Sequence, residues 1–364
     1  MNTTTAGVDL AKYLFSVCMM DSHGHVLLRR ELRREAFAEW LAQLAAGTIV
    51  AMEACSGAHH WARRCIELGL QPRLIAAQFV TPFRKSQHSK NDRNDAEAIA
   101  TAARQGNMRF VAVKTVDQQA RLSWHRVREG YKTENLAVMN RLRGLLAEFG
   151  IVIAQSAIAL RRALAQIVER EDVPGEFIEL IAGLREHWQA LQSHLRACDA
   201  RIDTHARADA RCQRIRGLTG IGPLTADAMV ASVGDGRDYK NGRQMAAWLG
   251  LVPQQHSSGG RERLGRISCS GDAYLRTLLI QGARSSVQQA SRVPADKATP
   301  EQIWINQLAT RLPFGKLLVA IANKHARQVW AMLARGEAYD PDAWLHHRMV
   351  QRNATRRRAL AVAA

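Results

Sequence analysis

The hydrophobic pattern of this sequence changes near Val116, and this change limits the folds that the chain can adopt. Before it, short apolar or alternating runs that predict strands are interspersed with stretches of helical spacing. After it, apolar residues recur almost only at helical spacing. We therefore expect an α/β domain at the N-terminus, a helical middle and a mainly α-helical C-terminal region.

The N-terminal pattern predicts a sheet that begins with antiparallel strands and continues with parallel ones. The expected strands are Thr5–Leu10, Leu14–Met20, Val26–Leu32, Thr48–Glu53 and Pro72–Ala77, and the expected helices are Glu35–Ala46, His59–Leu68 and one that starts at Asp95. The fourth strand is apolar until its end, which is typical of a buried strand with parallel neighbours. This order of elements predicts an RNase H-like (RuvC-like) domain over residues 1–112.

Residues 113–205 are expected to be helical and to carry a heptad seam. After Pro174 and Gly175, apolar residues recur at steps of four and three, the spacing of a coiled coil. They are Phe177, Ile181, Leu184, Trp188, Leu191, Leu195, Cys198 and Ile202. An intermolecular coiled coil and an antiparallel helix pair within the chain fit this seam about equally well. The apolar stretch Leu145–Leu160 contains polar residues, so we expect a buried helix there and no membrane span.

A third region is expected over residues 206–335, followed by a basic tail over residues 336–364. Gly220 and Gly222 precede an expected helix at Thr225–Val233, and free backbone N–H groups at a helix start can hold a phosphate. This pattern favours a helix–hairpin–helix-like turn that grips nucleic acid, with a purely structural turn as the alternative. A second helix is expected at Pro313–Leu333. The arginines of the tail are Arg348, Arg352, Arg356, Arg357 and Arg358.

Composition points to a polyanionic partner. The chain has 51 Lys and Arg residues against 33 Asp and Glu residues, a formal net charge of +18. A surplus of this size is self-repelling, and nucleic acid is the commonest polyanion that relieves it. The hydrophobic fraction of 47% excludes wholesale disorder. Six cysteines without metal-ligand spacing, and an N-terminus without a signal-peptide pattern, predict a cytoplasmic protein with reduced thiols.

Four acidic residues are placed as a metal site requires. Asp9 lies on the first expected strand and Glu53 ends the fourth, and these strands are neighbours in the RNase H-like order. Asp92 and Asp95 are three residues apart at a helix start and share one face. Taken singly, Asp95 fits a first-turn acid, Asp92 an N-cap and Asp9 a turn residue. As a set they favour metal ligation, since converging carboxylates require a hard cation: Mg²⁺, with Mn²⁺ as the alternative.

A serine-containing loop is the other candidate site. It spans Gly250–Gly260, contains His256, Ser257 and Ser258, and is followed by Arg261, Arg263 and Arg266. Small polar residues among glycines predict a flexible loop, and the arginines predict contact with a phosphate backbone. From chemistry alone, serines in such loops are usually turn residues. His256 is close enough in sequence to be a base, although neighbouring loop side chains often point apart.

Two ordered sets of motifs carry a resemblance that runs from residue 6 to about residue 335. The first set is Gly7-Val8-Asp9, Met52-Glu53-Ala54 and Lys90-Asn91-Asp92-Arg93-Asn94-Asp95-Ala96; the second is Gly220-Ile221-Gly222, Thr225-Ala226, Gly250-Leu251-Val252-Pro253, Ser258-Gly259, Ile267-Ser268, Gly271 and Leu275-Arg276. The first set resembles the Asp-Glu-Asp-Asp signature of the insertion sequence 110 family of transposases. The second resembles the C-terminal domain of the same family.

This resemblance implies a RuvC-like nuclease domain, a coiled-coil middle and a transposase domain with a catalytic serine. The family's nucleophile is the serine directly before glycine, which corresponds to Ser258 rather than Ser257. The family also implies a structured guide RNA encoded by the element, and composite sites between subunits of a homo-oligomer, a dimer or a tetramer. One position departs from the pattern: Cys269 stands where relatives commonly carry lysine, so a phosphate-facing charge is missing there.

The expected function is that of a DNA transposase or recombinase that binds element ends and target DNA. Asp9, Glu53, Asp92 and Asp95 are expected to bind metal, and Ser258 to form a covalent link to DNA. The residues expected to contact nucleic acid are Lys90, Arg93, Gly220, Gly222, Gly259, Arg261, Arg263, Arg266 and Arg276. The alternatives are a RuvC-like hydrolytic nuclease, in which water attacks and Ser258 only positions DNA, and a catalytically silent nucleic-acid-binding protein.

Overall fold

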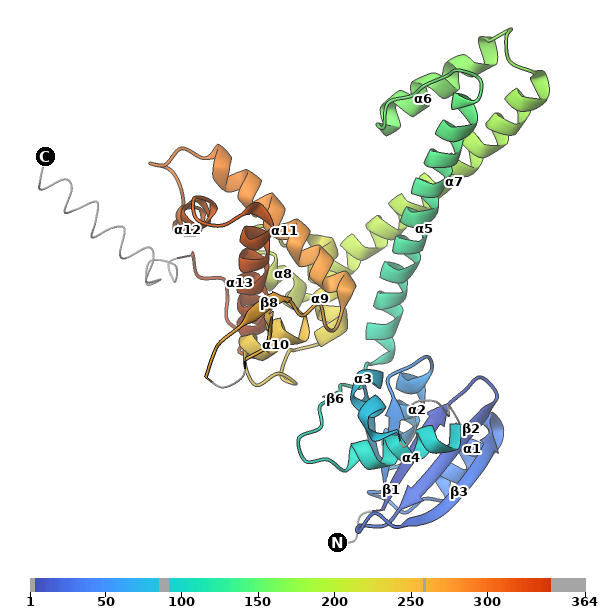
Figure 1. Ribbon diagram of the computed structural model, residues 1–364, viewed down its shortest axis with the longest axis vertical. Helices are drawn as coiled ribbons and strands as arrows, with labels where there is room; N and C mark the ends of the chain where they lie inside the picture. The colour runs from blue at the N-terminus through green and yellow to red at the C-terminus, as the bar shows by residue number, and fades with distance from the viewer. Residues whose placement is uncertain (1–3, 85–91, 258–259, 342–364) are drawn as a thin grey trace, which may run out of the picture. The chain divides into compact units, whose positions relative to one another are not determined.

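The computed structural model describes residues 4–84, 92–257 and 260–341. The chain divides into two compact units, Met1–Val116 and Asp117–Ala364. Figure 1 shows that the first unit contains a sheet covered by helices and that the second is mainly helical. This confirms the expected α/β N-terminal region and the mostly helical remainder. No helix within the described ranges is long and apolar enough to cross a membrane.

The first unit is built on a six-stranded sheet with the strand order β3-β2-β1-β4-β5-β6. Its strands are β1 (Thr5–Leu10), β2 (Leu14–Met20), β3 (Val26–Arg33), β4 (Ile49–Glu53), β5 (Gln71–Ile75) and β6 (Phe110–Val111). β1, β4 and β5 are parallel, whereas β2, β3 and β6 run antiparallel to their neighbours. The central strands β1 and β4 are largely buried, as their apolar sequences predict.

Helices cover both faces of this sheet (Figure 1). α1 (Arg34–Ala42) and α2 (Ala58–Glu67) pack on the face that carries Val8 and Met52. α3 (Ala77–Val80), the 3₁₀ turn η1 (Thr81–Phe83) and α4 (Asp92–Ala103) lie on the opposite face, where Ile99 of α4 shares a core with Ala51 of β4. The sheet is therefore the middle layer of three, and α4 packs mainly against β1 and β2 on this face.

The five expected strands are present, but two helix ends of this unit differ from expectation by more than one residue. α4 begins at Asp92 rather than at Asp95, so both acids are in its first turn. α1 ends at Ala42 rather than at Ala46. The cause is a tighter turn: the N–H groups of Gln43 and Leu44 bond to carbonyls only three residues back.

The second unit begins with two long antiparallel helices, α5 (Val116–Ala147) and α7 (Gly175–Ala208). Residues that come later along α5 contact residues that come earlier along α7, as expected for antiparallel helices. The Arg201 guanidinium lies over the Trp124 ring, Trp188 Nε1 donates to Asn135 Oδ1 at 2.9 Å, and the rings of Phe149 and Phe177 are 4.0 Å apart. α6 (Ala157–Gln166) and η2 (Ile167–Glu169) pack against this pair.

The heptad residues of α7 pack within the chain, the second of the two alternatives that the sequence left open. Ile181, Trp188 and Leu191 are buried in a core shared with α5 and α6. The prediction of a continuous helix over Leu145–Leu160 is wrong. α5 ends at Ala147 and α6 begins at Ala157, and between them Gly150 adopts a positive φ of 72° that ends helical geometry.

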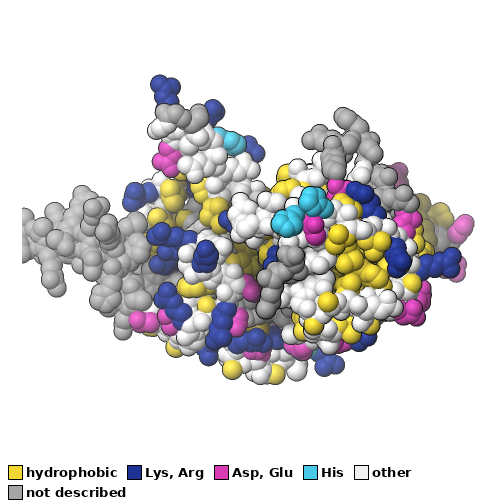
Figure 2. Space-filling view, turned by 90° about the horizontal axis from the view of Figure 1, so that it is seen from below, with side chains coloured by type: hydrophobic (Ala, Val, Ile, Leu, Met, Phe, Trp, Pro, Cys, Tyr) yellow, Lys and Arg dark blue, Asp and Glu magenta, His cyan; other side chains and the backbone are white. Residues whose placement is uncertain are grey.

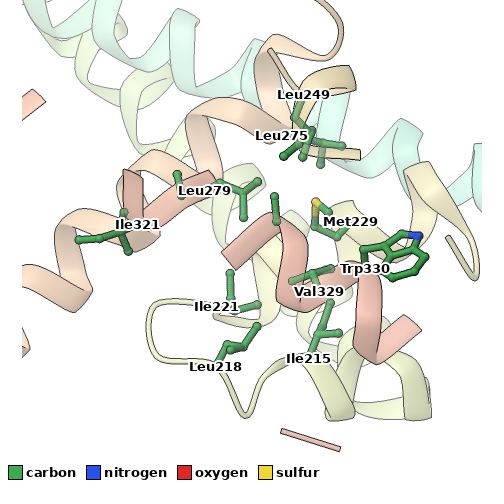
Figure 3. Packing of buried hydrophobic residues seen from close by; sticks show 14 of the residues in the cluster. Ile215, Leu218, Ile221, Met229, Leu249, Leu275, Leu279, Ile321, Val329 and Trp330 are labelled. Atoms are coloured by element: carbon green, nitrogen blue, oxygen red, sulfur yellow. The ribbon is translucent and has the colours of Figure 1, made fainter. Parts of the chain in front are cut away.

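The rest of the second unit is a helical bundle. Its helices are α8 (Ala210–Ile215), α9 (Pro223–Val233), α10 (Gly242–Trp248), α11 (Ala273–Arg292), α12 (Pro300–Ala309) and α13 (Phe314–Ala334). Figure 3 shows the centre of its core, where Met229 of α9, Leu279 of α11 and Val329 of α13 converge. This core fixes α9, which follows the glycine turn at Gly220–Gly222, and α11, which follows the serine-containing segment Gly250–Gly260.

A two-stranded hairpin, β7 (Pro253–Gln255) and β8 (Leu264–Ile267), interrupts this bundle. The prediction that strands end near Val116 is therefore wrong at this position, and one part of the expected loop, Pro253–Gln255, is a strand. Both strands are short and almost entirely exposed. Neither has a buried face, so their sequences show no apolar alternation.

Candidate catalytic site

Asp9 and Glu53 lie side by side in register at the ends of adjacent strands. The parallel ladder pairs Val8 of β1 with Met52 of β4, and Asp9 and Glu53 are the next residues on each strand. Parallel neighbours in register point to the same face of a sheet. The two carboxylates therefore share one face at one edge of the sheet.

That face is the one covered by α4. Side chains alternate along a strand, so Asp9 shares the face of Gly7, and Glu53 shares the face of Ala51. A Cβ added at Gly7 would lie 2.8 Å from the Cβ of Ala100 and closer still to the backbone of α4. Glycine is therefore required at this position for the helix to approach β1 so closely.

The first turn of α4 brings a further acid, Asp95, to this face. Asp95 is 5% exposed and directly precedes Ala96, whose carbonyl oxygen is one of the atoms that a Cβ at Gly7 would meet. Asp92 is the first residue of α4. Its side chain lies outside the described part of the chain, as do Lys90 and the side chain of Arg93.

Arg84 contacts two of these acids. Its Nε is 2.9 Å from Oδ1 of Asp95, and its Nη2 donates to Oε1 of Glu53 at 3.3 Å. One guanidinium thus connects the end of β4 with the first turn of α4. Arg84 belongs to no sequence motif and was therefore not predicted as part of the site.

The four acids offer the oxygen ligands that hard divalent cations prefer. Among the described side chains, which exclude that of Asp92, no group of three or more His, Cys, Asp or Glu residues is arranged to hold a metal ion. The contact of both Glu53 and Asp95 with a cationic guanidinium nevertheless shows that negative charge gathers here. Carboxylate oxygens gathered in this way are of the chemical type that binds a divalent cation.

Cys55 is a second group near these acids that the sequence analysis did not connect to them. Burial raises the pKa of the Cys55 thiol, and the charges of Glu53 and Asp9 raise it further. An anionic surrounding disfavours the thiolate in the same way that it favours a bound cation. The thiol is therefore suited to remain protonated at neutral pH.

The hairpin β7–β8 carries the serine segment. The N–H of His256 donates to the carbonyl of Arg263 at 2.9 Å, and the N–H of Arg263 donates to Ser257 Oγ at 3.2 Å. Ser257 thus closes the described end of the hairpin. Ser258 and Gly259 lie outside the described residues; in sequence they fall between β7 and β8.

The base of the hairpin is fixed to α11 by Arg276. Its Nη1 donates to the carbonyls of Leu249, at 3.1 Å, and Ser270, at 3.0 Å. Arg276, expected to contact nucleic acid, therefore also supports the hairpin. Cys269, the residue in place of a lysine, is exposed and has a positive φ of 52°, and its N–H donates to the carbonyl of Gly250.

The glycine turn before α9 lines an open groove of about 650 Å³. Gly220 has a positive φ of 85°, and a Cβ there would lie 2.7 Å from Ser286 Oγ of α11, which itself donates to the carbonyl of Thr219. Gly222 is the N-cap of α9 and has no side chain that could cap the N–H groups of the first helical turn, in which Pro223 itself has no N–H. Gly220 thus has a packing role, while Gly222 leaves backbone donors at the groove.

The remaining basic candidates are on the surface. Arg261, Arg263 and Arg266 are exposed on the hairpin. On the face drawn in Figure 2, Lys and Arg side chains are dispersed among apolar and acidic ones. The five arginines of the tail lie outside the described residues. The positive charge is therefore spread widely over the described surface seen there.

A buried ionic network around Asp227 of α9 also escaped the sequence analysis. Arg121 of α5 donates from Nε to Asp227 Oδ1 at 2.9 Å and from Nη1 to Asp209 Oδ2 at 2.8 Å. His125 Nε2 is 2.9 Å from Asp227 Oδ2, and its Nδ1 is 3.0 Å from the hydroxyl of Tyr274. The network joins α5 to the start of α8, to α9 and to α11. The sequence gives no signal for this network, because its members are far apart along the chain.

The electrostatics of this network favour a structural role. Burial alone would raise the pKa of Asp227, but hydrogen bonds from His125 and Arg121 outweigh it and hold that pKa below its ordinary value. For Asp209, burial also acts upward, and the bonds from Arg211 and Arg121 lower the pKa well below its usual range. Both carboxylates are therefore ionised and paired at neutral pH.

Two sequence signatures match this chain. One, described as a DEDD transposase of the IS110 type, matches residues 6–151, and the other, described as "Transposase IS116/IS110/IS902 family", matches residues 212–298. The first contains the acid-bearing sheet and the second contains the serine hairpin. Both signatures describe a class of protein, the transposases of insertion sequences.

Full-length relatives agree. The chain is 46% identical over 344 residues to a "Probable family 20 transposase" of Pseudomonas aeruginosa, covering 94% of this chain and 100% of the relative. It is 38% identical to the transposase for IS1111A of Coxiella burnetii, covering 92% and 90%, and 37% identical to that for IS1328 of Yersinia enterocolitica, covering 93% and 99%. The chain belongs to the IS110/IS116/IS902 family of insertion sequence transposases.

Proposed function

We propose that this transposase cuts and rejoins DNA with the four acids of the first unit and the serine of the hairpin. The observation that carries the proposal is the register of β1 and β4, which aligns Asp9 with Glu53 on the face where α4 presents Asp95. The strand order β3-β2-β1-β4-β5, with β2 antiparallel, supports a RuvC-like assignment for residues 1–112. Residues 113–205, 206–335 and 336–364 would be the helical, transposase and tail regions.

Asp9, Glu53, Asp92 and Asp95 would hold Mg²⁺ or Mn²⁺. A bound cation would polarise the scissile phosphate and stabilise the charge that develops on it. The part of this chain is to supply oxygen ligands on rigid elements: two at strand ends and two in the first turn of one helix. Such elements hold ligands more precisely than loops do.

Ser258 would act as the nucleophile. Its Oγ forms a bond to phosphorus while the bond between phosphorus and the leaving strand's oxygen breaks, and that oxygen leaves with a proton as a hydroxyl. The covalent phosphoserine keeps the energy of the phosphodiester for rejoining. The bond from Arg263 to Ser257 Oγ supports this choice, since Ser257 is engaged in closing the hairpin. The serine proton must be removed, and His256 is the neighbouring base to test.

DNA and RNA backbones would bind over the basic surface. Arg261, Arg263 and Arg266 on the hairpin are suited to phosphate contact, as are the N–H groups of the first turn of α9, which no side chain caps. With Cys269 in place of lysine, these arginines would supply the positive charge near the serine. The family resemblance further suggests a guide RNA from the element and a homo-oligomer, and the cysteine pattern suggests action in the cytoplasm.

Serine substitutions provide the test. Purified protein would be incubated with element-end DNA, RNA transcribed from the element and Mg²⁺, and both strand cleavage and protein–DNA adducts would be measured. We expect the protein–DNA adduct to disappear in Ser258→Ala and to persist in the matched control Ser257→Ala. We expect strand cleavage to fall in Glu53→Gln.

Two other outcomes would identify the alternatives. Cleavage that persists in Ser258→Ala, without any adduct in the parent protein, would indicate a hydrolytic nuclease. Metal-independent binding of these nucleic acids without cleavage would indicate a catalytically silent binding protein.

A further inference from the structure

Arg84 is a cation that lies between two of the four acids. Its contacts, Nε to Asp95 and Nη2 to Glu53, join side chains from separate segments of the first unit. Glu53 ends β4, Asp95 is in the first turn of α4, and Arg84 follows η1. One guanidinium thus occupies the position from which a cation can neutralise both carboxylates.

These contacts are shielded from water. The side chain of Asp95 is 7% exposed, that of Glu53 17% and that of Arg84 29%. Charges in such surroundings are screened less than charges at an open surface, so both their attraction and their repulsion are stronger. Two enclosed carboxylates destabilise each other unless a cation accompanies them. Arg84 therefore stabilises the acid site in the absence of a divalent ion.

The same oxygens cannot serve Arg84 and a divalent cation at once. Magnesium requires ligands at about 2.1 Å in near-octahedral arrangement. A cation held by Glu53 and Asp95 would meet the guanidinium at short range, where like charges repel. The backbone of Arg84 is held by a bond from its N–H to the carbonyl of Thr81 at 3.2 Å, so the flexible side chain is the part that can turn away.

We propose that Arg84 is an exchangeable internal counter-ion of the acid site. It holds the carboxylates of Glu53 and Asp95 together when no divalent metal is bound, and it gives up these oxygens when a metal binds. Arg84 thereby lowers the affinity for metal and prevents the acids from repelling one another before the metal is bound. This inference rests on the metal site of the proposed function.

The test measures metal binding rather than catalysis. Isothermal titration of the metal-free full-length protein with MnCl₂ would compare the parent with Arg84→Gln. The matched control is Arg29→Gln. Arg29 of β3 pairs with Glu97 of α4 at 2.6 Å, and Glu97 is not one of the four acids. Glu53→Gln removes a proposed ligand. A melting curve of each protein, with and without Mn²⁺, provides the second measurement.

We expect Arg84→Gln to bind Mn²⁺ about tenfold more tightly than the parent, equivalent to about 1.4 kcal/mol. Without metal it should melt at a lower temperature, and Mn²⁺ should raise its melting temperature more than that of the parent. Arg29→Gln should bind as the parent does, and Glu53→Gln more weakly. If Arg84→Gln fails to fold, Arg84→Lys should give an intermediate affinity, since lysine is a point charge that cannot span both acids.

Failure of this inference is distinguishable from failure of the metal site. Mn²⁺ binding that is weakened in Glu53→Gln but unchanged or weaker in Arg84→Gln would overturn the role of Arg84 and leave the metal site intact. No Mn²⁺ binding to the parent or to Arg84→Gln would overturn the metal site itself, and the inference with it.

Discussion

Replacing Gly7 with alanine should damage the acid site through the packing of α4. A Cβ at this position would lie 2.8 Å from the Cβ of Ala100 and closer to the backbone at Ala96. Carbon atoms pack at about 3.5–4.0 Å, so α4 must retreat from β1 by about 1 Å. Overpacking of this kind typically costs about 1–3 kcal/mol of stability.

The effect on catalysis should be larger than the effect on folding. Asp95 directly precedes Ala96, so any retreat of α4 moves this acid away from Asp9 and Glu53. A misplacement of about 1 Å can cost about 100-fold in rate. We expect Gly7→Ala to lose about that much Mg²⁺-dependent strand cleavage while remaining folded by circular dichroism.

The matched control is Gly106→Ala. Gly106 has no atom within 4 Å of an added Cβ, and its φ is not positive. It should cleave DNA and unfold in urea as the parent does. A Gly7→Ala protein with parental cleavage and stability would refute the reasoning that α4 depends on this close approach.

Three further predictions concern the second unit. Asp227→Asn should lower the free energy of unfolding in urea by about 3–5 kcal/mol, because it weakens a buried ion pair with Arg121. The control Asp235→Asn, at an exposed ion pair, should change this free energy by less than about 1 kcal/mol. Equal effects of the two substitutions would contradict the structural role of Asp227. Because the pKa values of Asp227 and Asp209 lie below the ordinary 3.8, their stabilisation should be complete above about pH 4 and lost as the pH falls further, and Asp227→Asn should reduce this acid-induced loss in urea titrations. Arg266→Ala should reduce the slope of log DNA-binding constant against log salt concentration by about 1. Arg276→Ala should mainly reduce cleavage, because Arg276 supports the base of the hairpin. Fluorescence anisotropy of DNA binding at several salt concentrations distinguishes the two effects.

Much of the acid-bearing sheet could be predicted from local sequence. β1, β2 and β4 have apolar patterns that define their ends to within a residue, and the parallel pairing of β1 with β4 follows from the order of the elements. The proximity of Asp9 and Glu53 in register follows from that pairing. Arg84 could not be predicted in this way, because its two partners come from elements far apart in sequence.

The second unit was harder to predict because its important contacts are non-local. A heptad seam on α7 requires a partner helix, but the spacing alone does not indicate whether α5 of the same chain or another chain supplies it. The strands β7 and β8 have no buried face, so they lack the alternation that identifies strands. Arg121 and Asp227 are 106 residues apart, and only folding reveals that they form an ion pair.

The most direct test of the central claim is to identify the residue that becomes linked to DNA. Element-end DNA would be reacted with the protein, element RNA and Mg²⁺, trapped in denaturant and digested, and the nucleotide-bearing peptide would be sequenced by mass spectrometry. We predict a nucleotide on Ser258, lost in Glu53→Gln because the acids and the serine serve one reaction. A nucleotide on another residue, or cleaved DNA without any linked peptide, would contradict the account.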